Sequence, residues 1–352
     1  MAVSFLQLVD LFKASLGGII VALALSPLAI WIAKKIGLLD IPGSQAHKQH
    51  SRPTPLAGGI ALILSMVVLV PVFHLANKDI TPLLIALVII FIFGLWDDAK
   101  GLGAPIKLTG QILASILLIA SDVSVHFLEG LSIPHLSGNM LMVLDWGVTI
   151  FWFIGITNAF NLIDSMDGLA VGTAGIAFTF FMIMSLVAQQ TNLAVFSAAL
   201  VGICIGLYAF NVSPASLFLG DSGAQMLGFT LAAVGMIYTP NNLPQASSWF
   251  VPILVLGVPI FDTTLVVASR LIHHRPVFRA DRSHTYHRLV AWGLDPYRAV
   301  LIIHLATLVL SFVAFIALSF PPTEATLTFF GMVLAGVIIL IFLARKDLQI
   351  EK

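Results

Sequence analysis

The stretch WGVTIFWFIGITNAFNLIDSMDGLA, residues 146–170, joins an apolar run to a series of polar side chains. The run is long enough, continued to Ile163, to cross a bilayer as a helix. The polar side chains recur at intervals of three residues: Asn158, Asn161, Asp164 and Asp167. On a straight helix this spacing would place the first and the last on opposite faces. We therefore expect the asparagines on the last turns of the helix and the aspartates where it ends, before Gly168.

The composition of the chain indicates an integral membrane protein. Of its 352 residues, 59% are hydrophobic and 10% are charged, and the mean hydropathy is +1.03. Soluble globular domains carry about 25% charged residues. The formal net charge is zero, which gives no sign of nucleic-acid binding. Cys204 is the single cysteine, so the chain cannot form an internal disulfide or a thiolate metal site.

We expect an all-α polytopic membrane protein with about eleven membrane-spanning helices, since a span takes roughly 17 to 25 apolar residues. The expected spans are Leu16–Ala33, Ala57–Ala76, Ile80–Trp96, Ile106–Ala120, Gly147–Ile163, Val171–Ala188, Leu193–Phe210, Ala224–Tyr238, Trp249–Leu271, Ala299–Phe320 and Ala325–Leu343. The segment 123–145 alternates and contains Gly and Pro, so it is expected to be an outside loop. No second domain is predicted, and residues 1–352 form a single membrane domain.

The positions of Lys and Arg predict the orientation. If the N-terminus is outside, every Lys and Arg except Lys13 and Lys78 falls on the other side of the membrane. Cytoplasmic loops carry such an excess of positive charge. We therefore expect the N-terminus outside, the C-terminus in the cytoplasm, and a basic cytoplasmic loop at 271–298, in the plasma (inner) membrane.

Four polar clusters that are far apart in sequence fall on this cytoplasmic side. They are GLWDDAKGLG with Asp97 and Asp98, NAFNLIDSMDG, FNVSPASLFLGDSG with Asn211 and Asp221, and RLIHHRPVFRADRSHTYHRL. The other side has nothing comparable. We expect the four clusters to form one site, in cytoplasmic loops and helix ends, whose ligands are mainly aspartate and asparagine oxygens.

Each cluster also has a simpler explanation. NAFNLIDSMDG could be a polar helix end with capping residues, and Asp97 and Asp98 could simply face water. Arg275 and Arg298 could hold the topology or contact anionic membrane lipids. Asn158 and Asn161, however, precede the helix end by a turn or more, and polar groups at that depth are costly unless they are paired. Their depth favours a binding site.

Oxygen ligands indicate a hard cation such as Mg²⁺, or alternatively Mn²⁺, rather than zinc. Magnesium usually takes one or two protein carboxylates and completes its shell with substrate phosphates. We therefore expect a substrate that bears phosphate. Arg282, His284 and His287 lie in the polar segment DRSHTYH and could bind phosphates.

In their order and on one membrane side, these motifs resemble those of the polyprenyl-phosphate N-acetylhexosamine-1-phosphate transferases, of the glycosyltransferase family 4 type. Among these the chain looks most like the bacterial undecaprenyl-phosphate GlcNAc-1-phosphate transferases. The resemblance runs from about Lys34 to Trp292. It rests on PLAGG, GLWDDAKGL, IKLTGQ, NAFNLIDSMDGL, LFLGDSG, VPIFD and DRSHTYHRL.

The resemblance implies transfer of N-acetylhexosamine 1-phosphate, with GlcNAc the preferred sugar, from a UDP-sugar to undecaprenyl phosphate. UMP would be released, and the lipid-linked product would serve cell-envelope polysaccharide synthesis. By the same resemblance Asp221 would be the principal Mg²⁺ carboxylate, with Asn161 a second ligand. Asp97 and Asp98 would position or deprotonate the lipid phosphate. The implied substrate contacts are Lys107 to phosphate, Asp164, Asp167, Asn211 and Phe218 to uridine, and Arg282, His284 and His287 to the diphosphate or sugar.

Two points remain open in the sequence. Relatives tend to have HIHH where this chain has HTYH, so Tyr286 stands in place of a histidine, and the resemblance fixes the reaction more closely than the sugar. The three consecutive histidines of muramoyl-pentapeptide transferases are also absent, which favours a simple UDP-N-acetylhexosamine. A secondary transporter is the alternative function, because intramembrane carboxylates often mark ion pathways. Its sites tend to lie near the bilayer midplane within repeats, and no repeat is found. The sequence leaves a homodimer open.

Overall fold

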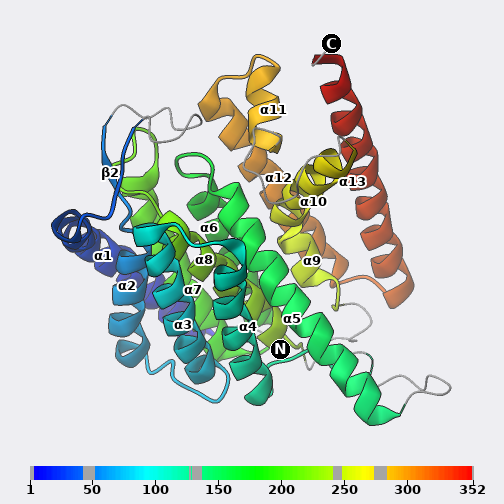
Figure 1. Ribbon diagram of the computed structural model, residues 1–352. Helices are drawn as coiled ribbons and strands as arrows, with labels where there is room; N and C mark the ends of the chain where they lie inside the picture. Colours follow the sequence, from blue (N-terminus) through cyan, green and yellow to red (C-terminus); the bar gives the residue numbers. More distant parts are fainter. Residues whose placement is uncertain are drawn as a thin grey trace.

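The computed structural model describes residues 4–42, 52–126, 128, 137–240, 248–272 and 284–350, with side chains to residue 344. Its helices are α1 Phe5–Ile36, α2 Gly58–Val72, α3 Ile80–Lys100, α4 Ala104–Ala120, α5 Gly138–Ile163, α6 Leu169–Val187, α7 Thr191–Asn211, α8 Gly220–Ile237, α9 Val251–Val255, α10 Gly257–Ile272, α11 Thr285–Ala291, α12 Pro296–Ala317 and α13 Pro322–Ile350. Two short strands, β1 Leu39–Asp40 and β2 Thr54–Pro55, pair antiparallel. The helices form one bundle, and the two termini lie toward its opposite ends (Figure 1).

The helices confirm a polytopic membrane protein. Within the described ranges, seven are long and apolar enough to cross a membrane: α1, α3, α5, α6, α7, α12 and α13. The apolar helices α2 and α4 are shorter. Each expected span coincides with a helix, except that the ninth is divided between α9 and α10. The count of eleven spans and the orientation stay predictions.

The predicted outside loop at 123–145 is wrong over its last third. Helix α5 begins at Gly138, and the Ser137 hydroxyl accepts a hydrogen bond from the Met140 amide at 3.4 Å. Serine is a favourable residue at such a helix start. Asp145, expected in a polar loop, is instead buried on α5, where its carboxylate accepts hydrogen bonds from the Leu128 amide.

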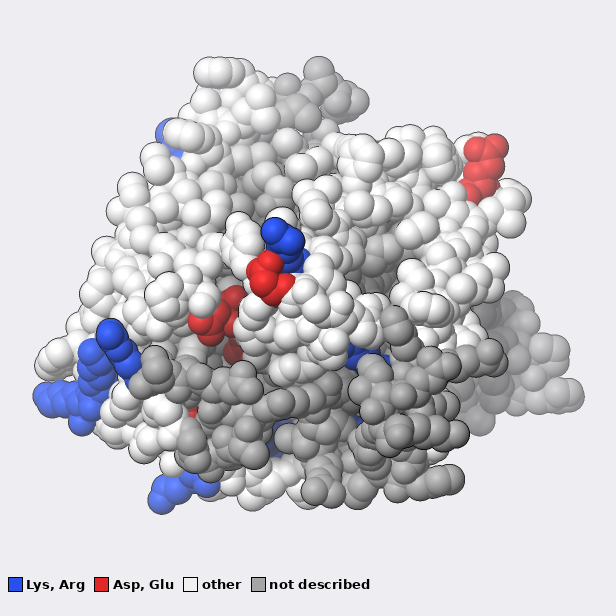
Figure 2. Space-filling model, turned by 90° about the horizontal axis from the view of Figure 1, so that it is seen from above, with Lys and Arg blue, Asp and Glu red and all other residues white. Residues whose placement is uncertain are grey.

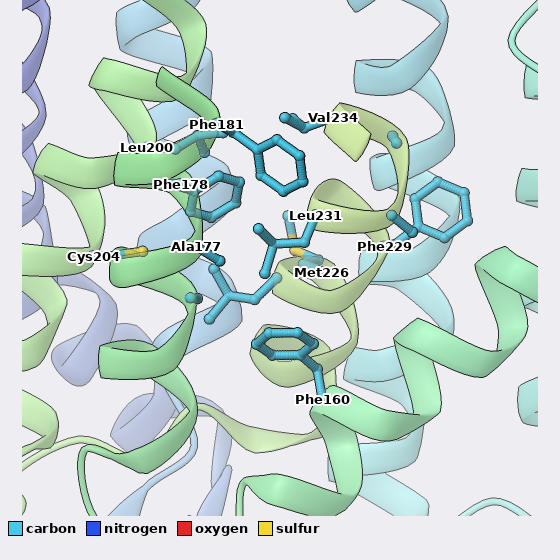
Figure 3. Close-up of a cluster of buried hydrophobic side chains, with 14 of the residues drawn as sticks. Phe160, Ala177, Phe178, Phe181, Leu200, Cys204, Met226, Phe229, Leu231 and Val234 are labelled. Carbon is cyan, nitrogen blue, oxygen red and sulfur yellow. The ribbon is translucent and has the colours of Figure 1, made fainter. Parts of the chain in front are cut away.

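Helix α8 lies at the centre of the bundle. Every residue from Ser222 to Gly235 is buried, and the helix packs against α3 and α5 on one side and α2 and α6 on others. Phe229 stacks on Phe153 of α5 with ring centroids 4.7 Å apart, and Phe178 and Phe181 of α6 close the other side (Figure 3). Burial on all sides fixes α8, and therefore fixes the polar residues at its first turn.

Helices α1 and α7 pack unusually closely along their length. A Cβ on Gly18 would collide with the carbonyl oxygen of Ala199, and one on Gly202 with that of Ser15. Small residues of this kind let two helix backbones approach within a membrane. The side chain of Gln7 also donates to the Thr191 hydroxyl, 3.1 Å away and 184 residues along the chain.

Candidate active site

The turn between α5 and α6 has the form that its sequence predicts. Helix α5 ends at Ile163, the Asp164 amide still bonds to the Phe160 carbonyl, and α6 begins after Gly168. Gly168 has a φ of 77°, a left-handed conformation that favours glycine. The asparagines thus lie on the last turns of α5 and the aspartates beyond them, which confirms that part of the prediction.

The motif GDSG forms the first turn of α8, and Asp98 from α3 holds it in place. The carboxylate of Asp98 accepts hydrogen bonds from the Asp221 amide at 2.7 Å and the Ser222 amide at 3.2 Å. It also accepts one from the Ser222 hydroxyl at 2.6 Å. Because the amides at a helix start lack partners within the helix, Asp98 serves as a cap from another helix. Both of its oxygens therefore have a structural partner.

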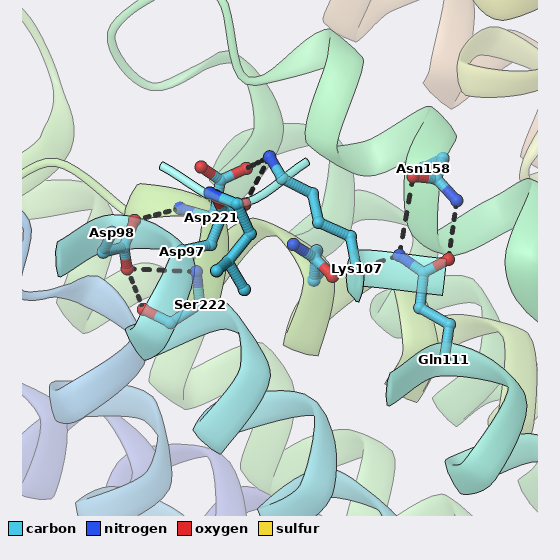
Figure 4. A network of polar contacts seen from close by, with 9 residues as sticks. Asp97, Asp98, Lys107, Gln111, Asn158, Asp221 and Ser222 are labelled. Atoms are coloured by element: carbon cyan, nitrogen blue, oxygen red, sulfur yellow. Dashed lines mark hydrogen bonds and ion pairs between the residues drawn. The ribbon is translucent and has the colours of Figure 1, made fainter. Parts of the chain in front are cut away.

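Lys107, near the start of α4, brings two of the predicted carboxylates together. Its ammonium forms an ion pair with Asp97, and its Nζ lies 3.6 Å from Oδ1 of Asp221 (Figure 4). Asp97 is buried and also accepts a hydrogen bond from the Leu102 amide at 2.7 Å. The chain thus places one cation between two anions from different helices, with Lys107 and Asp221 both partly exposed.

Asp164 lies in the negative field of these groups. Burial raises the pKa of Asp164 to about 8, and the nearby charges of Asp221, Asp167 and Asp98 contribute to the rise. Among the described residues, neither Asn161 nor Asp164 has a hydrogen-bond partner for its side chain. Asp98, Asp164, Asp167 and Asp221 therefore create an excess of negative charge, and the side chains of Asn161 and Asp164 are unengaged among the described residues.

Asn211 and Asp167 link the α5–α6 turn to the segment before α8. Asn211 is buried, accepts a hydrogen bond from the Gly168 amide at 3.1 Å and donates to the Leu217 carbonyl at 3.0 Å. Asp167 accepts from the Ala215 amide at 3.2 Å. Both ends of the Asn211 amide bond to backbone, so the structure gives this residue a scaffolding part in the site.

Phe218 belongs to the same segment and joins it to the entry of α2. Its carbonyl accepts hydrogen bonds from the Ala57 and Gly58 amides at 3.1 and 3.0 Å, and its amide donates to the Pro55 carbonyl. The motifs PLAGG and LFLGDSG, more than 150 residues apart, therefore meet through their backbones. Phe218 is half-buried.

Helix α11 carries the described part of the predicted phosphate-binding segment. His284 is buried, and its Nδ1 lies 2.8 Å from Oδ2 of Asp262 on α10. The Thr285 amide donates to the other Asp262 oxygen at 2.7 Å. Burial, and then the negative charge of Asp167, raise the pKa of Tyr286. The His287 ring packs near Tyr286, with centroids 5.1 Å apart. Arg282 lies outside the described residues.

Asn158 is not on the rim of the site. It lies one turn inside α5 and its side chain meets Gln111 of α4, away from the carboxylates (Figure 4). Sequence reasoning also missed Asp262, Ser222 and Gln225 as contributors. Gln111 and Gln225 carried a usable signal, since each is a lone amide one helical turn beyond a charged site residue.

The face of the molecule that carries α11 holds this site. Seen from above, acidic side chains lie near the middle of that face, one of them beside a basic side chain, and further basic side chains lie toward its left edge (Figure 2). Of the site residues, Asp97 and Asp98 lie near the end of α3, Asp164 and Asp167 follow the end of α5, Asp221 lies at the start of α8, and Lys107 lies near the start of α4. Predicted site residues from four helices therefore meet at one end of the bundle.

Comparisons with known proteins agree with this arrangement. The profile of glycosyl transferase family 4 matches residues 80–239. The chain is 30% identical over 312 residues to the probable undecaprenyl-phosphate N-acetylglucosaminyl 1-phosphate transferase of Bacillus subtilis (strain 168), covering 88% of this chain and 86% of the relative. It is 30% identical over 347 residues to the decaprenyl-phosphate N-acetylglucosaminephosphotransferase of Mycobacterium tuberculosis (strain ATCC 25618 / H37Rv), covering 90% and 84%.

A phospho-N-acetylmuramoyl-pentapeptide-transferase of Bacillus subtilis (strain 168) is 28% identical over 297 residues, which is 78% of this chain and 88% of that one. The fold and the site together define a polytopic membrane protein with a carboxylate-rich centre at one end of its helices. The chain belongs to glycosyl transferase family 4, with the polyprenyl-phosphate sugar-1-phosphate transferases as its relatives. The comparisons give no support to a transporter.

Proposed function

We propose that the protein transfers N-acetylglucosamine 1-phosphate from UDP-N-acetylglucosamine to undecaprenyl phosphate. A lipid phosphate oxygen attacks the sugar-bound phosphorus, the bond to the UMP phosphate breaks, and UMP leaves. The lipid-linked sugar serves synthesis of a cell-envelope polysaccharide. Relatives whose names specify N-acetylglucosamine and a polyprenyl phosphate support this proposal.

The contact of Lys107 with both Asp97 and Asp221 is the observation that carries the proposal. Phosphoryl transfer requires charge neutralisation and in-line positioning more than covalent chemistry. A lysine between two carboxylates, at one end of the helix bundle, would suit a site where a lipid phosphate meets a water-soluble nucleotide. The buried Cys204 lies on α7 among apolar neighbours and offers no nucleophile there.

The residues present fit a magnesium ion. Within the described ranges no three His, Cys, Asp or Glu side chains are grouped to hold a metal. Mg²⁺ needs only one or two protein carboxylates when substrate phosphates complete its shell. Asn161 and Asp221 would hold it, since Asn161 has an unengaged side chain and Asp221 is partly exposed. The ion, when bound, neutralises phosphate charge, and Mn²⁺ has ligand preferences that suit the same oxygens.

The other side chains bind and orient the substrates. Lys107 contacts the lipid phosphate, and its ion-pair partner Asp97 helps to position or deprotonate it, whereas Asp98 holds the start of α8. Asp164, Asp167 and Phe218 face the uridine, and Asn211 shapes their backbone. Asp262 fixes the ring of His284 through Nδ1, which leaves Nε2 to contact the diphosphate or sugar together with His287 and Arg282.

The site faces the cytoplasm of a plasma (inner) membrane in this proposal. The excess of Lys and Arg on the side that carries the motifs supports this orientation. UDP-sugars are cytoplasmic metabolites, and the lipid phosphate reaches them at that membrane face.

Release of UMP by purified protein tests the proposal. Protein in detergent is given undecaprenyl phosphate, Mg²⁺ and, in parallel, UDP-GlcNAc, UDP-GalNAc and UDP-MurNAc-pentapeptide. We expect UMP and a lipid-linked sugar with UDP-GlcNAc, and neither without the lipid. Asp122→Asn, in an exposed position at the other end of α4, serves as the matched control for aspartate changes in the site.

Two results would contradict the proposal. Absence of UMP release from every donor, by protein that is folded and monodisperse, would remove the transferase function for this chain. UMP release only with UDP-MurNAc-pentapeptide would retain the reaction and replace the sugar.

A further inference from the structure

Three amide side chains, two of them buried and the third half-buried, join α4, α5 and α8 near the site. Gln111 of α4 donates from Nε2 to Oε1 of Gln225 on α8 at 3.0 Å. Asn158 of α5 donates from Nδ2 to Oε1 of Gln111 at 2.7 Å, and the reverse contact from Gln111 to Asn158 is 3.5 Å (Figure 4). Gln111 and Gln225 are 1% and 2% exposed, so water does not compete for the bond between them, and Asn158 is half-buried.

Each amide lies one helical turn from a residue of the site. Gln111 follows Lys107 by four positions on α4, and Gln225 follows Asp221 by four on α8. Asn158 precedes Asn161 by three on α5. Residues three or four apart share a helix face. The amide network therefore ties together the same three helices whose ends carry Lys107, Asn161 and Asp221.

We propose that Gln111, Asn158 and Gln225 are positioning residues that set the spacing of Lys107, Asn161 and Asp221 for the transfer. They touch no substrate and act through the three helices. This inference rests on the proposed function for its catalytic consequence, while its geometric part stands on the hydrogen bonds alone.

The chemistry of the network supports a positioning part over simple stability. An apolar trio would also pack these helices, but through contacts that have no donor or acceptor direction. Paired amides have fixed donor and acceptor directions, so they hold one rotation and one depth of each helix. In phosphoryl transfer a displacement of about 1 Å can lower the rate about a hundred-fold.

The test replaces the whole network with leucine in the triple variant Gln111→Leu/Asn158→Leu/Gln225→Leu. Removing all three partners leaves no buried amide unpaired, so the change can be nearly neutral for stability. Ser115→Ala is the matched control, since Ser115 is buried on the same helix and its hydroxyl bonds only within that helix, to the Gln111 carbonyl. The single variant Gln111→Leu removes the partner of the buried Gln225 amide and leaves Asn158 only its bond to the Ile154 carbonyl at 2.8 Å, so it is expected to be less stable than the triple variant.

Two readouts are taken on each protein. The first is kcat for UMP release with saturating substrates and Mg²⁺. The second is the distance distribution between spin labels at Ile106→Cys and Ser165→Cys in a Cys204→Ala background; both positions are exposed at the site ends of α4 and α5. This second readout needs no activity, so it remains informative if the wild-type protein releases no UMP.

We expect the triple variant to fold, to broaden the label distribution, and to lower kcat by about ten- to a hundred-fold. Ser115→Ala should match the wild type in both readouts. Wild-type kcat in the triple variant would overturn the proposal, whatever the labels show. An unchanged distribution would also overturn it, since the helices would then be held by other contacts. If the wild-type protein releases no UMP but the label distance distribution is broader in the triple variant, the proposed function is contradicted and the geometric inference is retained.

Discussion

Asp98 and Asp221 are both aspartates of the site, yet they have different partners. Both carboxylate oxygens of Asp98 accept hydrogen bonds from the amides and the hydroxyl at the start of α8, whereas Asp221 is partly exposed and lies near Lys107. A carboxylate that caps a helix contributes through geometry, and one that faces an open centre can bind a cation. The two residues should therefore respond differently to neutral substitution.

Asp221→Asn should lower kcat by about 10² to 10³-fold, a loss typical of removing one charged contact to a phosphoryl transition state. The amide keeps the size of the side chain, so the protein should remain folded. The measurement is UMP release against Mg²⁺ concentration, with Asp122→Asn as the control. Chelation by EDTA should abolish wild-type activity, and Mg²⁺ or Mn²⁺ should restore it. Near wild-type turnover by Asp221→Asn would exclude it as the metal carboxylate.

Asp167→Asn should chiefly raise KM for the UDP-sugar. The substitution keeps an oxygen to accept from the Ala215 amide, so the loop is preserved while the charge is lost. Loss of a hydrogen bond to substrate costs about 1–3 kcal/mol, or about ten- to a hundred-fold in affinity. Two-substrate kinetics should show a small effect on kcat and little on KM for the lipid. A kcat loss as deep as that of Asp221→Asn, with KM unchanged, would place Asp167 among the catalytic groups.

At the scale of elements, the α3–α8 junction depends on Gly220. Its φ is 69°, and a Cβ there would lie 2.7 Å from both carboxylate oxygens of Asp98. Gly220→Ala should therefore displace the cap and lower both the unfolding temperature and kcat. Gly37→Ala is the matched control, because Gly37 has a φ of 77° with no atom within 4 Å of an added Cβ. Gly37→Ala should lower the free energy of unfolding only by the cost of a left-handed backbone conformation at alanine, about 1–2 kcal/mol.

Equal destabilisation by the two alanine variants, measured by thermal unfolding in detergent, would mean that Asp98 does not fix the first turn of α8. Full kcat in Gly220→Ala would lead to the same conclusion. In that case the close contact between Gly220 and the Asp98 carboxylate would not affect activity.

Elements also show what the sequence could and could not predict. Glycine and paired polar residues mark the ends of α5 and α8, and charge placement indicates one shared site. Spacing along the chain does not tell which neighbour a side chain will meet, however. Asn158 and Asn211 have the same chemical character as Asn161, yet their partners are Gln111 and backbone groups. Asp262 was missed for the same reason, since its partner His284 lies on another element.

At the scale of the whole molecule, the orientation can be tested by thiol labelling. Single cysteines at Lys100→Cys and Ser165→Cys, in a Cys204→Ala background, should react only with reagent on the cytoplasmic side. Asp122→Cys, whose native side chain is 93% exposed beyond the far end of α4, should react only from outside. Labelling of Ser165→Cys from outside would reverse the proposed orientation and move the site away from its cytoplasmic substrate.

The close packing of α1 on α7 has a consequence for biosynthesis. A ribosome adds about 5–20 residues per second, so 184 residues separate the emergence of Gln7 and Thr191 by about 10 to 40 s. During that interval the small-residue face of α1 has only lipid or insertion machinery beside it. A bulky residue at Gly18 or Gly202 should thus reduce the yield of inserted protein. The molecules that do assemble should keep a normal kcat, so the loss would appear in the amount of protein and not in its turnover.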